Sequence, residues 1–146
     1  MRSPAEAYDE LIRRVKETVL LASCASLLGW DQQTYMPSAG AEGRAMQLAT
    51  LSKLAHDRFV SEEFAAALDA SRSEIAGLPL EDDAAALVRR VARDLDKQRR
   101  VPSEYVAEFS RLTALAHPIW EKARADANFA HFRPSLEKIV AMRREY

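Results

Sequence analysis

The feature that most limits the fold is a regular spacing of apolar residues in the last third of the chain. Six apolar side chains recur at steps of four, three, four, three and four residues: Tyr105, Phe109, Leu112, Ala116, Ile119 and Ala123. This spacing predicts a helix whose apolar seam lies along another helix. Pro118 falls inside the helix, where it lacks an N–H and crowds the carbonyl of Ala114, so we expect a kink there.

Helical spacing also fills the rest of the chain, and no segment alternates apolar and polar residues as a strand would. Caps and first-turn residues predict further helix starts at Ser3-Pro4 with Glu6, near Ala41, at Ser61, at Asp82-Asp83 and at residues 101–104, and a last helix carries Leu136, Ile139 and Val140. The first helix should run to about Gly29 or slightly beyond, and Asn128 should open a turn before the last one. We expect an all-α fold of about six helices in an antiparallel, bundle-like arrangement, with the first and fifth helices the longest.

Composition limits the class of protein. The 146 residues favour a single helical domain over 1–146, and 48% hydrophobic with 29% charged residues exclude a disordered chain. The net charge of -1 gives no general attraction to nucleic acid. The apolar run of residues 19–28 is half the length of a membrane span, so we expect a buried stretch of helix and no membrane partner. Cytoplasmic location is the default, since no secretory signal is recognisable.

Three histidines are present, and the sequence favours a plain structural interpretation for them. His56, His117 and His131 do not form a His-Glu-x-x-His motif. His117 and Glu121 can share a helix face, but a zinc site needs three or four ligands. We therefore expect surface or partly buried histidines, and assign no catalytic, cofactor-binding or metal residue to this chain.

Two other clusters have a plain structural interpretation. Ser23, Cys24 and Ser26 are small residues that allow helices to pack closely, and Cys24 has neither a nearby base nor a disulfide partner. The basic stretch of residues 89–100 is diluted by Asp94 and Asp96. It predicts a solvated helix face rather than an anion site.

The least ordinary segment is residues 30–37, where aromatic residues stand beside an aspartate and glutamines. Trp30, Asp31 and Gln32 could shape a binding cleft or anchor a loop to the core. The chemistry favours the structural role, in which the Trp30 ring is buried and Asp31 and Gln32 satisfy loop backbone groups. The alternative is that these three residues contact substrate.

Residues 27–37 and the segments that follow them share the order of residues of a known protein family. The stretch Leu-Leu-Gly-Trp-Asp-Gln-Gln-Thr-Tyr-Met-Pro, with residues 40–45 and 47–51, resembles the start of the thermostable (Taq-type) metallocarboxypeptidases. Residues 120–124, 129–130 and 132–140 resemble the same family further on. The family's His-Pro-Phe motif is not carried over, because Ile119 follows His117-Pro118 here.

The resemblance implies the N-terminal segment of a longer, all-helical enzyme that removes C-terminal residues from peptides. The family's zinc or cobalt site would lie beyond Tyr146, so this chain alone should be inactive, with its helices forming a wall of the substrate channel. The final helix has no terminating residue, which is typical of a chain cut in mid-helix. The alternative is a free-standing helical binding or assembly module. In either case we expect a homo-oligomer, a dimer or larger, through exposed apolar surface.

Overall fold

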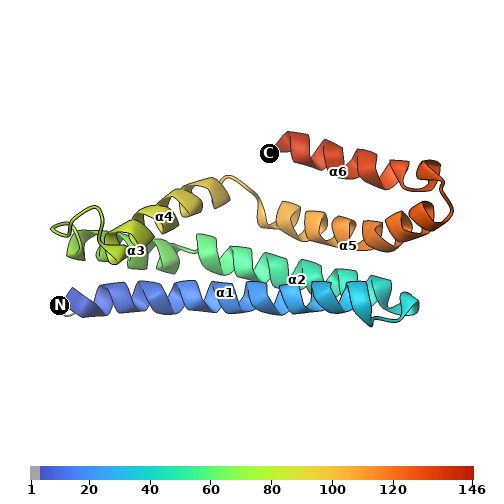
Figure 1. Cartoon of the computed structure of the whole chain (residues 1–146). Helices are drawn as coiled ribbons and strands as arrows, with labels where there is room; N and C mark the ends of the chain where they lie inside the picture. Colours follow the sequence, from blue (N-terminus) through green and yellow to red (C-terminus); the bar gives the residue numbers. More distant parts are fainter. Residues whose placement is uncertain (1–3) are drawn as a thin grey trace. The chain divides into compact units, whose positions relative to one another are not determined.

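The computed structural model describes residues 4–146, and in this range it is helical with no strand. The elements in chain order are α1 (Pro4–Thr34), η1 (Ser38–Gly40), α2 (Ala41–Val60), α3 (Glu62–Glu74), α4 (Asp83–Gln98), α5 (Ser103–Ala125), η2 (Phe129–His131) and α6 (Arg133–Glu145) (Figure 1). The expected all-α fold of six helices is confirmed, and α1 and α5 are its longest members, with 31 and 23 residues. The expected cap Ser3 lies outside the described residues.

Helix starts in the middle of the chain follow the capping residues. The Ser61 hydroxyl accepts a hydrogen bond from the N–H of Phe64, and the Asp82 carboxylate accepts from the N–H groups of Ala84 and Ala85. Each cap pairs backbone donors that the first turn of a helix leaves without an internal partner. The expected starts of α3 and α4 are therefore confirmed.

The chain forms two compact units. One contains residues 4–20 and 55–102, and the other contains residues 21–54 and 103–146. Each unit thus takes part of α1 and part of α2. The two units are described separately below, so the expectation of a single domain over residues 1–146 stays a prediction.

The first unit has an apolar core made by α3, α4 and the beginning of α1. Its buried members are Leu11, Phe64, Ala67, Leu68, Val88, Val91, Ala92 and Leu95. A polar contact joins the same helices: Ser71, which is fully buried, donates its hydroxyl to the carbonyl of Ala7 at 2.9 Å. The carboxylate of Glu74 accepts the N–H of Tyr8 at 3.0 Å, close to the positive end of α1.

The second unit buries mostly alanine on α2 and α5: Ala45, Ala49, Ala114, Ala116 and Ala123. Here α5 and α6 lie against each other as an antiparallel pair joined by η2 (Figure 1). The Tyr105 hydroxyl donates to the carbonyl of Met142 at 2.7 Å, and the Arg143 guanidinium lies 4.7 Å from the centre of the Phe109 ring. The predicted seam is confirmed at these positions, whereas Ile119 is 39% exposed.

Burial of residues 19–28 is the main expectation that the structure contradicts. Val19, Leu20 and Leu27 are 55%, 65% and 64% exposed, and Cys24 and Ser26 are exposed as well. A single helix covers only the stripe that faces its neighbours, so a run that is apolar on all sides leaves part of itself in solvent. No helix within residues 4–146 is long and apolar enough to cross a membrane.

Candidate functional site at the end of helix α1

Trp30, Asp31 and Gln32 lie in the last two turns of α1, which continues to Thr34. The helix closes on Asp31, whose carbonyl accepts the N–H groups of both Tyr35 and Met36 at 3.0 Å. Pro37 follows and cannot extend the helix. The three candidate residues are therefore held by regular helix rather than by a loop.

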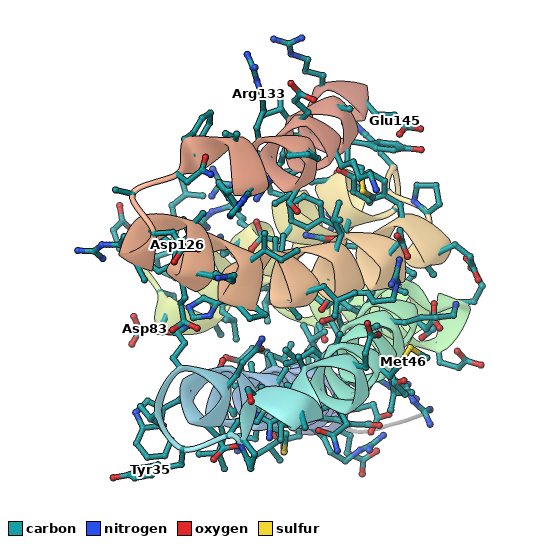
Figure 2. The ribbon with its side chains drawn as sticks, turned by 90° about the vertical axis from the view of Figure 1, so that its right-hand side faces the viewer. Tyr35, Met46, Asp83, Asp126, Arg133 and Glu145 are labelled. Atoms are coloured by element: carbon teal, nitrogen blue, oxygen red, sulfur yellow. The ribbon has the colours of Figure 1, made fainter. Side chains whose placement is uncertain are left out.

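The Trp30 ring is 56% exposed, so the expectation that it is buried is wrong. Its edge packs against Tyr35, with ring centres 5.7 Å apart and planes at 63°. Tyr35 is 77% exposed and projects away from the ribbon in Figure 2. Successive helix residues are turned by about 100°. Because Asp31 and Gln32 face neighbouring helices, Trp30 points elsewhere.

Asp31 makes an ion pair with an arginine of α2. Its Oδ2 lies 2.6 Å from Nη2 of Arg44, and Nη1 of the same guanidinium donates to the carbonyl of Leu28 in α1. The Arg44 side chain is only 11% exposed, and that of Asp31 is 36% exposed. Charge-assisted hydrogen bonds in a partly buried place hold α2 beside the end of α1. The partner of Asp31 is thus an arginine side chain, not the loop backbone groups that the sequence led us to expect.

Gln32 connects α1 to α5. Its Nε2 donates to the carbonyl of Ala114 at 2.8 Å, across 82 residues of sequence. In an α-helix this carbonyl would accept the N–H of residue 118, but Pro118 has none. Gln32 therefore satisfies the acceptor that Pro118 leaves without its helical partner.

We call Asp31, Gln32, Arg44 and the Ala114 carbonyl the α1 corner; all four belong to the second unit. The α1 corner ties α1 to α2 and α5, with the exposed Trp30–Tyr35 pair beside it. The sequence alone gave no sign of Arg44, whose partners lie 13 and 16 residues away across a turn. The spacing of Ala114 and Pro118 did indicate that the Ala114 carbonyl lacks its helical donor.

The histidines occupy three different environments. His56 is 7% exposed and its Nε2 lies 2.9 Å from the Val101 carbonyl, so it is more buried than expected. His117 Nδ1 is 3.7 Å from Glu121, and His131 Nδ1 is 3.8 Å from Asp126. No group of three or more His, Cys, Asp or Glu side chains within residues 4–146 could hold a metal ion. These donors do not fit the metal that the resemblance implies.

The basic stretch of α4 lies in solvent, in agreement with the expected solvated face. Arg90 pairs with Asp94 at 2.9 Å, Arg99 pairs with Glu62 at 3.2 Å, and Arg89 donates to the Leu80 carbonyl at 2.7 Å. All three arginines are exposed. The two exposed ion pairs contribute little to stability.

Exposed ion pairs within helices lower the pKa of a few carboxyl groups. The pKa of Glu10 falls to about 2, first because Arg13 donates hydrogen bonds to it and then because Arg14 does so too. A hydrogen bond from Lys122 lowers the pKa of Asp126.

Known proteins place the chain in one class. The sequence profile of the Carboxypeptidase Taq (M32) metallopeptidase family matches residues 10–146. Thermostable carboxypeptidase 1 of Thermus thermophilus is 32% identical over 98% of this chain and 28% of its own length. Thermostable carboxypeptidase 1 of Pyrococcus furiosus is 29% identical over 94% of this chain and 27% of its own length. The chain belongs to the Carboxypeptidase Taq family and resembles its N-terminal part.

A solved structure shows the same fold. The crystal structure of BsuCP superposes with a TM-score of 0.87 and 22% sequence identity, over 94% of this chain and 27% of that chain. The chain thus spans little more than a quarter of the length of the relatives that it matches.

Proposed function

We propose that this chain is the N-terminal helical part of a metal-dependent carboxypeptidase that removes C-terminal residues from peptides. The observation that carries the proposal is the family match, which covers residues 10–146. In the complete enzyme a bound zinc or cobalt ion would activate the water that attacks the peptide bond. This chain has no His-Glu-x-x-His motif and should be inactive alone.

Within that enzyme, the end of α1 would form part of a wall of the substrate channel. The α1 corner fixes the helix end to α2 and α5 by charged and polar contacts. Trp30 and Tyr35 are presented on this fixed base with more than half of each side chain exposed. Exposed aromatic rings on a rigid support suit contact with apolar side chains of a peptide. Asp31 and Gln32 would then be positioning residues, and Trp30 a substrate contact.

The alternative is a free-standing helical binding or assembly module that shares the family's N-terminal part. The exposed apolar side chains of α1 support association in either case, and we propose a cytoplasmic homo-oligomer. Light scattering tests the oligomer: a clean monomer at high concentration contradicts it. The reading frame beyond Tyr146 separates the two functions, because a downstream His-Glu-x-x-His motif supports the enzyme and a stop codon supports the module.

The activity is tested directly on purified protein. Metal content after dialysis and hydrolysis of a blocked peptide with added zinc or cobalt should both stay at background for residues 1–146. Stoichiometric metal or turnover here would contradict the proposed inactivity. In the complete enzyme, Trp30→Ala should lower kcat/KM, whereas the matched exposed substitution Leu20→Ala should not. Equal effects would contradict the channel-wall role.

A further inference from the structure

A hollow of about 660 Å³ lies in the first unit, where the loop between α3 and α4 passes over α4. Its floor is made by Ala85, Val88 and Ala92, which are 6%, 2% and 7% exposed. Two of these three side chains end at Cβ, so the surface of α4 is low at this place. The volume falls in the range of sites that bind small molecules.

Apolar side chains form one edge of the hollow. Ile75 directly follows α3, and Leu78 and Leu80 lie further along the loop; Leu78 is 44% and Leu80 is 70% exposed. The loop is held in place by Arg89, which donates to the Leu80 carbonyl at 2.7 Å. The leucines therefore stay beside the floor and extend its apolar surface, although water covers much of both.

Arginines form the remaining edge. Arg72 of α3 and both Arg89 and Arg93 of α4 line the hollow. Arg72 has a long, exposed pair with Asp69 at 3.4 Å, and within residues 4–146 Arg93 makes no ion pair or side-chain hydrogen bond. No carboxylate belongs to the lining itself. The hollow thus combines an apolar floor with positive charge that is incompletely paired.

This combination selects among ligand classes. Apart from the three guanidinium groups, the side chains that line the hollow carry no hydrogen-bonding group. A peptide, sugar or nucleotide would place polar atoms on this floor, where no side chain offers them a hydrogen bond. An unbranched alkyl chain has no such atoms, and a carboxylate at its end matches the planar fork of a guanidinium.

We propose that this hollow, which we call the α3–α4 site, binds an aliphatic carboxylate. The alkyl chain lies on Ala85, Val88 and Ala92 against Leu80, and the carboxylate meets Arg93. Binding is reversible and forms no covalent bond. All of its residues belong to the first unit, whereas those of the α1 corner belong to the second.

Nuclear magnetic resonance on ¹⁵N-labelled protein, titrated with decanoate, locates the ligand and measures its affinity. We expect saturable shifts of the amides of Leu78, Leu80 and Ala92. Decan-1-ol has the same chain without the charge and should bind about two- to fivefold more weakly, since an exposed charge pair contributes up to about 1 kcal/mol. Arg93→Gln should weaken decanoate binding by a similar factor, and Leu80→Ser should weaken it through the lost apolar contact.

The matched control is Arg90→Gln, on the same helix but paired with Asp94 and outside the hollow. It should bind decanoate as the unaltered protein does. Leu27→Ser controls for another exposed apolar position and should also have no effect. The proposal is overturned if decan-1-ol binds as tightly as decanoate, if both arginine variants lose affinity equally, if the shifts centre on Leu27 and Trp30, or if nothing binds.

Discussion

Gln32 and Ala114 are joined by a hydrogen bond of 2.8 Å, from the side-chain amide of α1 to a backbone carbonyl of α5. The carbonyl needs this donor because Pro118 gives it none. A proline inside a helix and a glutamine 86 residues earlier therefore act as a pair. The pair fixes the end of α1, where the exposed Trp30–Tyr35 rings lie.

Gln32→Ala should lower the free energy of unfolding by about 1–3 kcal/mol, because it leaves the Ala114 carbonyl partly buried without a donor. In a Pro118→Ala background residue 118 regains an N–H for that carbonyl, so Gln32→Ala should cost less there. Urea denaturation of the four proteins measures this coupling. The neighbouring Gln33→Ala, at an exposed position, should change stability by under about 0.5 kcal/mol. Equal costs in both backgrounds would show that Gln32 does not act through Ala114.

Asp31→Ala should cost about 1–3 kcal/mol, because the Arg44 guanidinium, 11% exposed at its side chain, loses its anionic partner. Chemical denaturation measures it. Glu108→Ala provides the comparison, since Glu108 and Arg111 form an exposed pair within one helix and such pairs contribute about 0.3–0.5 kcal/mol. If the two substitutions cost the same, the Asp31–Arg44 pair does not hold α2 to α1.

Trp30→Ala should cost about 1 kcal/mol or less, because over half of the side chain is already in solvent. Phe64→Ala, at a position 1% exposed in the core of the first unit, should cost about 3–5 kcal/mol. Thermal melts of both variants make the comparison. A large loss for Trp30→Ala would restore the buried, loop-anchoring role.

Ala127→Gly should stabilise the protein by about 1 kcal/mol. Ala127 has φ of 50° and lies just after α5. The N–H of Ala127 donates to the carbonyl of Arg124, and the N–H of Asn128 donates to the carbonyl of Ala123. This closure favours glycine, because a Cβ is strained in the left-handed region. Ala107→Gly inside α5 is the control and should destabilise by about 0.5–1 kcal/mol. A melting temperature that falls in both variants would contradict the expectation.

Glu10 should titrate with a midpoint near 2 when its side-chain carboxyl is followed by nuclear magnetic resonance. Its folded-state pKa lies below the ordinary value of 4.5, so its contribution to stability is present above pH 4.5 and disappears as the pH falls toward 2. Arg13→Gln should raise the midpoint and reduce this acid-dependent loss of stability. Arg93→Gln, on α4, should leave the midpoint unchanged. An unaltered midpoint in Arg13→Gln would exclude Arg13 as the main cause.

Local signals in the sequence were sufficient for the helices. Ser61 and Asp82 cap α3 and α4 because their side chains reach N–H groups two or three residues ahead, a distance that sequence spacing fixes. The helical period of apolar residues predicted α5, and residues within 27–51 and 120–140 indicated the family. The burial of residues 19–28 was misjudged, because hydrophobicity says which residues favour an interior but not which side of a helix has a neighbour.

What the sequence alone determined was the helical class, most helix boundaries and the family, since these depend on short-range spacing. Only the tertiary structure decided which residues of the candidate site meet. Arg44 and Ala114 reach Asp31 and Gln32 across 13 and 82 residues, and no local period records such a contact. The same holds for Arg72 and Arg93, which come from different helices to one hollow. The physical reason is that the packing of whole helices determines which side chains meet, whereas each backbone hydrogen bond within a helix joins residues four apart in the sequence.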